Sequence, residues 1–349
     1  MLYCYPTEAT RDNWLQATLI VILRRVHNSI NSGSQIQDWA DLVPSAYLDE
    51  LQSRTGLRDR ISEYAVAFES LSNPERLQVV DALARQNSLP QLVRGSRTCK
   101  CVAELPGPIR EPAKKIGGEA FRLLTEFKVR DKQYLRIYKT LRHKVCPFCG
   151  IGHFGSPQSH REDLDHYLPR TKYPFAAANL KNLPPMCDSC NTDYKRDADP
   201  IRNSHGSRQA LYPYGDQSFE ISLLQSDPFD STLGSSPRWQ VDIVPNLPES
   251  NTWDEVFSIK DRYTNDFLNP YYRVWLDEFG GWCKSAKLFP TTREELLDAV
   301  NRYLEWKRAD PLEGRNFLKA AVFELLYKHC DNGEQRVIGL LIDVVAMNN

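Results

Sequence analysis

Cys146-Pro147-Phe148-Cys149, followed after 37 residues by Cys187-Asp188-Ser189-Cys190, decides the fold of the central region of this chain. Each Cys-x-x-Cys pair presents two sulfur atoms from one tight turn, and together the pairs offer the four thiolates that a structural zinc requires. A simple zinc ribbon separates its pairs by only about 15 to 20 residues. The sequence therefore predicts a closed Cys4 zinc site whose long interval forms structure of its own.

Polar residues with a second pattern lie in this interval and directly after it. The pattern consists of Asp165-His166-Tyr167-Leu168-Pro169, Tyr173-Pro174, Asn182-Leu183, and Asn191 directly after Cys190. In this order the residues resemble the HNH, or ββα-metal, endonuclease family in its Cys4-zinc form. They most resemble the PtuB-type HNH subunits of bacterial anti-phage systems such as Septu and some retrons. The resemblance covers Cys146 to Pro200 and does not extend to the flanks.

The resemblance assigns a role to each motif residue. Asp165 matches the first ligand and Asn191 the second ligand of a catalytic metal ion, and oxygen donors of this kind suit Mg²⁺ or Mn²⁺ better than zinc. His166 matches the general base. Asn182 matches the residue that fixes the hairpin and orients the base. The resemblance thus implies an enzyme, a hydrolase that cleaves DNA and leaves 3'-hydroxyl and 5'-phosphate ends, with an ATPase subunit of the defence system as its partner.

Two basic residues follow Asn191 and are candidates for binding the scissile phosphate. Lys195 and Arg196 lie on the expected helix, where solvated surface side chains are the alternative reading. Asp163 is either a partner that orients a metal ligand or a solvated acid.

The remaining histidines and tyrosines of the interval carry less specific patterns. His153 and His160 lie off the motif, where surface positions are expected. Tyr167 and Tyr173 either pack the hairpin or stack on sugar and base, and packing is the more frequent use of such residues.

Two other functions stay open from the sequence alone. The cysteine pairs can build a zinc finger that binds nucleic acid or protein without catalysis, in which case the Asp-His pair is incidental. An HNH site grips a phosphate and can ignore the sugar, so RNA is an alternative substrate.

Composition limits the class of protein. With 349 residues, 41% hydrophobic and 26% charged, the chain is typical of a globular protein with two or three domains. Its longest strongly apolar run, Thr18 to Leu23, is far shorter than the ~20 residues of a membrane span. Nine cysteines without a disulfide pattern, and no secretory signal, predict a cytoplasmic protein. Cys99 and Cys101 are too closely spaced for a second metal clip and are expected to be ordinary thiols.

Charge is unevenly distributed although the net charge is only -1. Residues 110–145 carry eleven Lys or Arg against four acids and run directly into the first cysteine pair. This basic stripe is either a surface that attracts a phosphate backbone or a solvated helix face.

The pattern along the chain predicts an α+β, mainly helical protein with a central ββα-metal HNH module. We expect a helical N-terminal region at residues 1–104, a linker followed by a basic helix at 105–145, the HNH module at 146–210, and a mainly helical region with a short strand pair at 211–349. The linker is predicted from the Pro and Gly residues of 104–118, and one long helix is expected over 119–143. Strands are expected at 219–224 and 239–244, with a loop at 227–237 between them.

Overall fold

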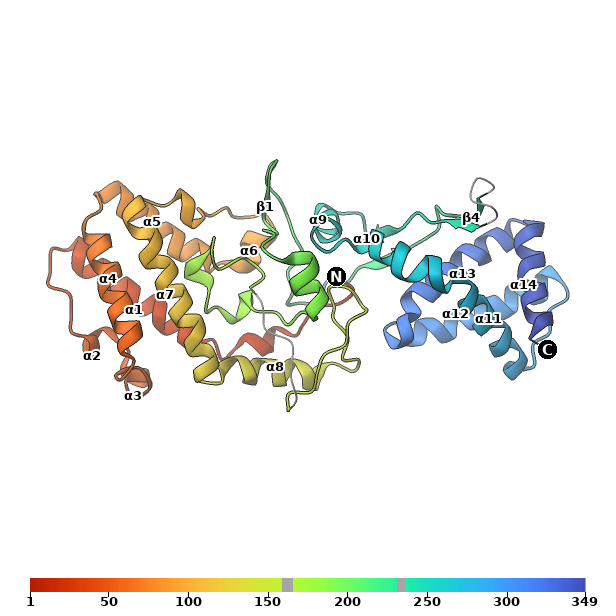
Figure 1. The fold of residues 1–349 in the computed structure, drawn as a ribbon, viewed down its shortest axis with the longest axis horizontal. Helices are drawn as coiled ribbons and strands as arrows, with labels where there is room; N and C mark the ends of the chain where they lie inside the picture. Colours follow the sequence, from red (N-terminus) through yellow and green to blue (C-terminus); the bar gives the residue numbers. More distant parts are fainter. Residues whose placement is uncertain (159–165, 231–235, 349) are drawn as a thin grey trace. The chain divides into compact units, whose positions relative to one another are not determined.

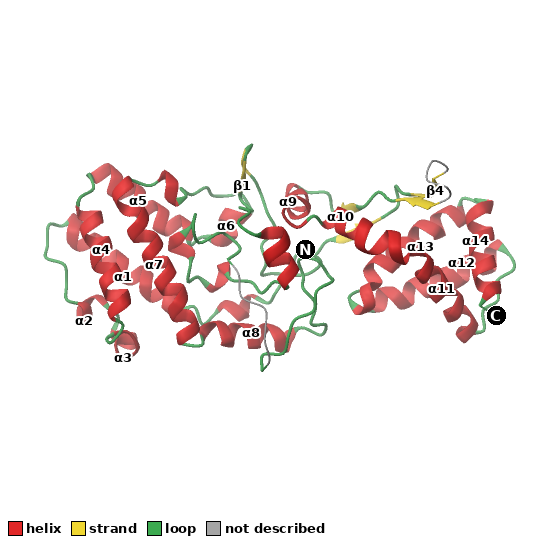
Figure 2. Ribbon diagram, in the orientation of Figure 1, coloured by secondary structure: helices red, strands yellow, loops and turns green. Residues whose placement is uncertain are grey.

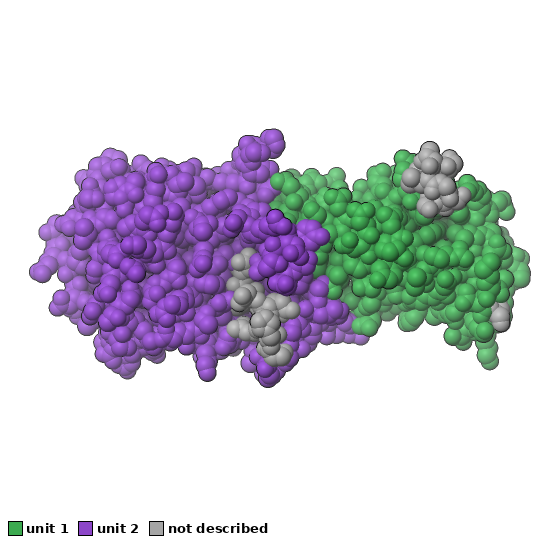
Figure 3. All heavy atoms as spheres, in the orientation of Figure 1, with its two compact units in different colours: residues 1–2, 147–151, 218–349 green, residues 3–146, 152–217 purple. Residues whose placement is uncertain are grey.

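The computed structural model describes residues 1–158, 166–230 and 236–348, and these residues form two compact units (Figure 3). We call residues 3–146 and 152–217 the N-terminal unit, and residues 1–2, 147–151 and 218–349 the C-terminal unit. Helices dominate both units, and the strands form small antiparallel pairs (Figure 2). The structure therefore confirms an α+β, mainly helical protein. No helix in the described ranges is both long and apolar enough to cross a membrane.

The N-terminal unit contains eight α-helices in its described part, together with short 3-10 helices, one π-helix and one two-residue strand pair (Figure 1). The α-helices are α1 (Trp14–Asn31), α2 (Trp39–Leu42), α3 (Leu48–Leu51), α4 (Thr55–Glu69), α5 (Asn73–Gln86), α6 (Leu89–Val93), α7 (Gly107–Glu126) and α8 (Val129–Thr140). The 3-10 helices are η1 (Thr7–Thr10), η2 (Ser45–Tyr47), η3 (Val102–Glu104), η4 (Pro174–Ala176) and η5 (Leu180–Asn182), the π-helix is η6 (Ser189–Lys195), and the strands are β1 (Arg202–Asn203) and β2 (Gly206–Ser207).

Helix α7 occupies most of the segment that the sequence predicted as a linker, so that prediction is wrong. Its Pro108 lies in the first turn, where a backbone N–H has no helical partner to lose. Ile109, Ala113 and Ile116 recur at helical spacing and are buried, and the helix packs against α4 and η4. Gly117 permits the contact with η4, because a Cβ at this position would lie 2.6 Å from the carbonyl oxygen of Pro174.

The long helix expected over 119–143 is interrupted. Helix α7 ends at Glu126 and α8 begins at Val129, because Lys128 adopts a left-handed conformation with φ of 55°. Phe127 precedes this break and packs its ring edge to face against Trp14 of α1, with centroids 5.3 Å apart. Tertiary packing thus redirects a segment whose apolar spacing is helical throughout.

The interval between the cysteine pairs forms a buried core of its own, as its length predicted. Leu168, Tyr173, Phe175, Leu180 and Leu183 are each at most 1% exposed. The described part of this interval consists of turns and the 3-10 helices η4 and η5 rather than regular strands.

The C-terminal unit combines small strand pairs with a helical bundle. Its strands are β3 (Glu220–Ser222), β4 (Asp227–Asp230), β5 (Ser236–Arg238) and β6 (Asp242–Val244). Its helices are α9 (Pro248–Phe257), α10 (Ile259–Arg262), the π-helix η8 (Tyr263–Leu268), α11 (Asn269–Ala286), α12 (Arg293–Ala309), the 3-10 helix η9 (Glu313–Arg315), α13 (Asn316–Asp331) and α14 (Gln335–Met347). Helix α12 packs on α13, and α11 on α14.

The strand pair predicted from the sequence is present. Strands β3 and β6 pair antiparallel with Ile221 opposite Ile243, and both isoleucines are buried. Between them, where a loop was expected, β4 and β5 form a second antiparallel pair that begins with Asp227 opposite Arg238. This stretch is rich in Ser, Pro, Gly and Asp, which predicted a turn. The strands β4 and β5 on either side of the turn could not be recognised from this composition.

Candidate metal centre

The four cysteines of the two Cys-x-x-Cys pairs gather at one buried point. Their Sγ atoms all lie within 4.8 Å of one another, and none of the four residues is more than 5% exposed. Four Zn–S bonds of about 2.3 Å place the sulfur atoms of a tetrahedral site about 3.8 Å apart. The cluster therefore has the ligand number, ligand type and spacing of a site that can hold one metal ion.

Local backbone structure explains how the pairs meet. Gly150 has φ of 66°, the left-handed conformation that favours glycine. Gly152 has no side chain at a point where a Cβ would lie 2.6 Å from Cys187 Sγ. The Cys146 N–H donates to the Gly152 carbonyl at 2.7 Å, and the Cys187 N–H donates to Cys146 Sγ at 3.4 Å. An N–H donated to sulfur stabilises the thiolate, which is the form that binds metal.

All nine cysteines lie in the described part of the chain, and none of them forms a disulfide. Burial raises the pKa of the Cys99 thiol to about 12. Cys99 is therefore a neutral thiol at physiological pH, in agreement with the expected ordinary role.

His166 is held in one orientation by a backbone carbonyl. The side chain is 6% exposed, and its Nε2 lies 2.9 Å from the carbonyl oxygen of Ala177. A carbonyl only accepts hydrogen bonds, so Nε2 carries the hydrogen and Nδ1 carries the lone pair in the neutral ring. The imidazole also packs against Phe121 of α7, with ring centroids 4.4 Å apart.

Asn182 joins the segment after His166 to the turn that holds the imidazole. Its fully buried side chain accepts a hydrogen bond from the Leu168 N–H at 2.7 Å. It donates to the carbonyl oxygens of Leu168 at 3.0 Å and Ala176 at 3.3 Å. The Asn182 carbonyl accepts from the Tyr167 N–H at 2.8 Å. The side chain thus forms hydrogen bonds with three backbone groups and fixes the position of the two segments relative to each other.

Asn191 lies in the first turn of η6, next to Cys190. Its N–H donates to the Cys187 carbonyl at 3.0 Å, and the residue is half-buried. The helix expected after the second cysteine pair is a π-helix, a form that is frequent at functional sites.

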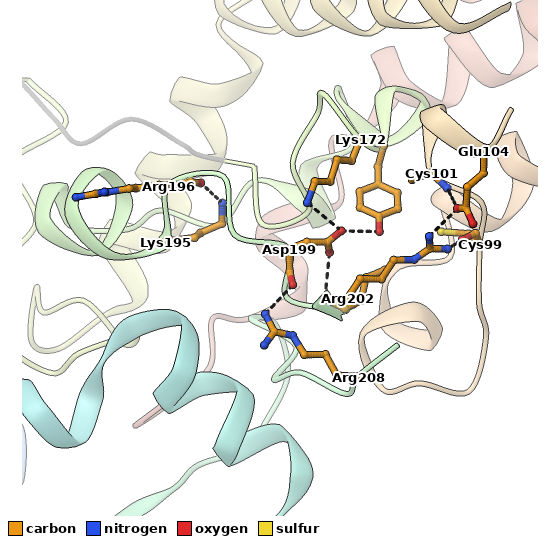
Figure 4. A network of polar contacts seen from close by, with 11 residues as sticks. Cys99, Cys101, Glu104, Lys172, Lys195, Arg196, Asp199, Arg202 and Arg208 are labelled. Carbon is orange, nitrogen blue, oxygen red and sulfur yellow. Dashed lines mark hydrogen bonds and ion pairs between the residues drawn. The ribbon is translucent and has the colours of Figure 1, made fainter. Parts of the chain in front are cut away.

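The two phosphate-binding candidates lie next to each other at the end of η6 (Figure 4), and they differ in exposure. Lys195 is 1% exposed, and its Nζ donates to the Arg196 carbonyl at 3.3 Å. The solvated reading is therefore wrong for Lys195. Arg196 is exposed and donates from Nε to the Thr192 carbonyl at 3.3 Å, so both readings of Arg196 stay open.

One further acid and two histidines were predicted beside the motif. Asp163, Asp165 and His160 lie outside the described residues. His153 is exposed, as expected.

Tyr167 and Tyr173 are buried and pack rather than stack on a ligand. The Tyr167 hydroxyl donates to the Leu211 carbonyl at 2.6 Å, and the Tyr173 hydroxyl donates to Asp199 Oδ2 at 2.8 Å. Both hydroxyls thus bind within the fold.

The sequence did not single out two arginines near His166. Arg130 of α8 and Arg170 lie over the ring of Phe121, with Cζ to centroid distances of 4.5 Å and 5.4 Å. The ring of Phe121, which belongs to α7, also contacts His166. Arg170 lies only four residues after His166. A basic residue so close to the motif could have been recognised from the sequence.

The basic stripe of residues 110–145 divides into two parts. On α7, Arg122 pairs with Glu119 and Glu126 of its own helix at 2.7 Å each. On α8, Lys132 and Lys139 are exposed and seven residues apart, which places them on one helix face. The α8 part thus keeps the phosphate-attracting alternative, whereas acids balance much of the α7 part.

No family model, curated protein or solved structure matches the chain. The motif residues and their contacts are therefore the observations that bear on function.

Proposed function

We propose that this protein is a metal-dependent HNH endonuclease that hydrolyses phosphodiester bonds of DNA. In this proposal His166 is the general base, Asp165 and Asn191 hold a Mg²⁺ or Mn²⁺ ion, and Asn182 positions the base. The four clustered cysteines hold a structural zinc. The resemblance to anti-phage subunits makes an effector role in bacterial defence, beside an ATPase subunit, part of the same proposal.

The hydrogen bond from His166 Nε2 to the Ala177 carbonyl carries the proposal. It assigns the proton to Nε2, so Nδ1 is the nitrogen that can take a proton from water. A histidine with a purely structural role needs only one hydrogen-bond partner and a packed ring, and it does not need a fixed tautomer. An imidazole whose tautomer is fixed, in a segment tied down by Asn182, has the arrangement that a general base requires.

The donor chemistry of the motif supports two separate metals. Soft cysteine sulfur suits zinc, whereas the carboxylate and amide oxygens of Asp165 and Asn191 suit a hard divalent ion. When bound, such an ion offsets the negative charge that develops at the phosphate during hydrolysis. Because Asn191 follows Cys190 directly, the cysteine cluster restrains the backbone that presents it.

The test compares cleavage of supercoiled plasmid with Mg²⁺ or Mn²⁺ by the unmodified protein and three histidine variants. We expect His166→Ala and His166→Asn to lower the cleavage rate about 100-fold or more. The asparagine variant keeps a polar side chain of intermediate size that cannot act as a base, and so it separates loss of the base from most of the loss of packing. His153→Ala changes an exposed histidine of the same interval and should stay within about twofold of the unmodified rate.

Equal cleavage by all four proteins would show that His166 is not the base. Binding of DNA without cleavage under every metal condition would favour the non-catalytic zinc finger. A parallel digestion of RNA with the plasmid's sequence decides between the two substrates.

A further inference from the structure

Two segments without acidic residues meet at one side of the N-terminal unit. Residues 82–103 and 200–215 together contain six Lys or Arg and no Asp or Glu. The Ala210 N–H donates to the Val93 carbonyl at 2.8 Å, and Arg202 donates to the Cys99 carbonyl. Positive charge from two distant parts of the sequence is thus concentrated in one place.

A cavity of about 170 Å³ lies between these segments. Its polar side chains come from Arg97, Thr98, Arg202, Ser207, Arg208 and Gln209, and none of the lining residues in the described part of the chain is acidic. A water molecule occupies about 30 Å³ of the liquid, so the cavity has room for a group of several heavy atoms such as a phosphate.

Two of the three guanidinium groups are held in place by the surrounding fold (Figure 4). Arg202 donates from Nη1 to Glu104 at 2.6 Å, and Arg208 donates from Nη2 to the Asp199 carbonyl at 2.8 Å. Arg202 also donates from Nη2 to the Cys99 carbonyl, and each guanidinium group has five N–H donors in total. The side chains are therefore oriented before any ligand arrives, which reduces the entropy lost on binding.

Of the two acidic side chains nearby, Asp199 is hydrogen-bonded within the fold and Glu104 neutralises one of the lining arginines. The carboxylate of Asp199 accepts hydrogen bonds from the Tyr173 hydroxyl at 2.8 Å and the Ile201 N–H at 3.2 Å, and Lys172 Nζ lies 3.7 Å away. Glu104 is paired with Arg202. The Cys99 thiol in the lining is neutral, as described above. The cavity itself is thus left with an excess of positive charge.

We propose that this cavity binds a phosphate group of a nucleic-acid backbone. The planar guanidinium of arginine matches the oxygen atoms of a phosphate and can bind them in pairs. Contacts of this kind hold and orient nucleic acid without reading its bases. The choice of a nucleic acid as the source of the phosphate rests on the proposed function, whereas the anionic ligand follows from the cavity alone.

The strand pair β1–β2 adds a surface beside the cavity. Arg202 belongs to β1 (Figure 1) and Ser207 to β2, and the turn between them, Ser204-His205, is exposed. The same stretch of chain continues from η6 through Asp199. A phosphate bound at the cavity is therefore held by the continuation of the segment that carries Asn191.

The test measures binding of a fluorescent duplex of about 20 base pairs to the His166→Asn protein without added divalent ions, over a series of salt concentrations. In this background we introduce Arg97→Gln and Arg208→Gln, with Arg58→Gln on α4 as the control. Arg97 and Arg58 are both exposed, so their substitution leaves the core intact.

We expect the Kd to rise about 3- to 10-fold for Arg97→Gln and Arg208→Gln, and the slope of log K against log salt to fall by about 0.9 for each lost phosphate contact. Arg58→Gln should change the Kd less than about twofold. Unchanged Kd and slope for Arg97→Gln overturn the proposal.

Calorimetry with inorganic phosphate distinguishes the source of the ligand. If Arg97→Gln and Arg208→Gln weaken binding of inorganic phosphate but not of the duplex, the cavity is a site for a free anion and the nucleic-acid assignment is wrong. Because cleavage is not measured, weakened duplex binding supports the proposal even if the endonuclease assignment fails.

Discussion

His27 is a buried imidazole in the helical part of the N-terminal unit, remote in sequence from the motif. The side chain is 2% exposed, its Nε2 lies 2.9 Å from the Tyr64 hydroxyl, and its ring stacks on Phe68 with centroids 4.1 Å apart. Burial lowers the pKa of His27 to about 4. The folded state thus resists protonation that the unfolded chain accepts near pH 6.5.

This shift predicts a loss of stability in weak acid. Because the folded pKa of His27 lies below the unfolded value, its contribution is complete above pH ~6.5 and is lost as the pH falls toward about 4. Between about pH 7.5 and pH 5 the loss amounts to about 2 kcal/mol. Urea unfolding should show this loss in the unmodified protein and a smaller loss in His27→Gln, which has no titrating ring. An equal pH dependence of both proteins contradicts the prediction.

Single residues also show what could be predicted near the site. The clustering of the four cysteines was predicted correctly, because metal ligands must be of particular types at particular spacings. Gly117 was misread as a helix breaker. A glycine is needed there because a Cβ would collide with the carbonyl oxygen of Pro174, 57 residues later in the chain. Arg170 was missed because its contact, the ring of Phe121, lies on a helix that precedes the motif. Local pattern predicts ligands better than it predicts their neighbours.

At the scale of elements, helix ends followed their sequence signals closely. Residues Thr292 to Glu295 have the capping-box pattern, a Thr followed three residues later by Glu, and in α12 both of its hydrogen bonds form: the Thr292 side chain accepts from the Glu295 N–H at 3.3 Å, and Glu295 Oε2 accepts from the Thr292 N–H at 3.2 Å. Helix α5 has Ser72 as its N-cap, and the Ser72 N–H donates to Glu75 Oε2 at 2.9 Å.

The cap of α12 gives a second prediction. Replacing Thr292 by Ala leaves the Glu295 N–H without its side-chain acceptor and should lower the free energy of unfolding by about 1 kcal/mol. The measurement is chemical denaturation of the full chain. The control is Ser285→Ala on α11, an exposed helical serine, which should stay within about 0.5 kcal/mol. Equal effects of the two substitutions would show that the capping box adds nothing to stability.

Elements were mispredicted where tertiary contacts outweigh local signals. The prolines and glycines of 104–118 predicted a linker, yet burial of one face of α7 against α4 and η4 makes the segment helical. The left-handed Lys128 divides a segment that is helical by its spacing, beside the packed ring of Phe127. In both cases the deciding contact involves residues that no local window contains.

At the scale of the whole molecule, the C-terminal unit includes two short segments, residues 1–2 and 147–151, that are distant in sequence from the rest of the unit. The Leu2 N–H donates to the Pro147 carbonyl at 3.0 Å. Trp253 Nε1–H donates to the Phe148 carbonyl at 2.8 Å, and the Tyr263 hydroxyl donates to the Cys149 carbonyl at 2.8 Å. The last two bonds join residues 105 and 114 positions apart in the sequence. The sequence alone could not predict them, because nothing in the local pattern identifies either partner.

The cysteine cluster yields a prediction that concerns the whole chain. A zinc ion bound by Cys146 and Cys187 closes a loop between residues 41 positions apart and compensates four buried thiolates. Binding free energy of this kind, about 10 kcal/mol or more in zinc-finger peptides, acts as folding free energy. We expect the purified protein to contain one zinc per chain and Cys187→Ser to contain much less.

Because each kcal/mol lowers the Tm of a domain of 150 to 250 residues by about 2 to 4 °C, loss of about 10 kcal/mol on chelation of zinc or in Cys187→Ser should lower the Tm by at least about 20 °C. Cys283 supplies the matched control, since it is also fully buried but is not part of the cluster. Cys283→Ser should keep one zinc per chain by elemental analysis, whatever its own effect on packing. If Cys283→Ser and Cys187→Ser retain the same amount of zinc, the four clustered sulfurs are not its ligands.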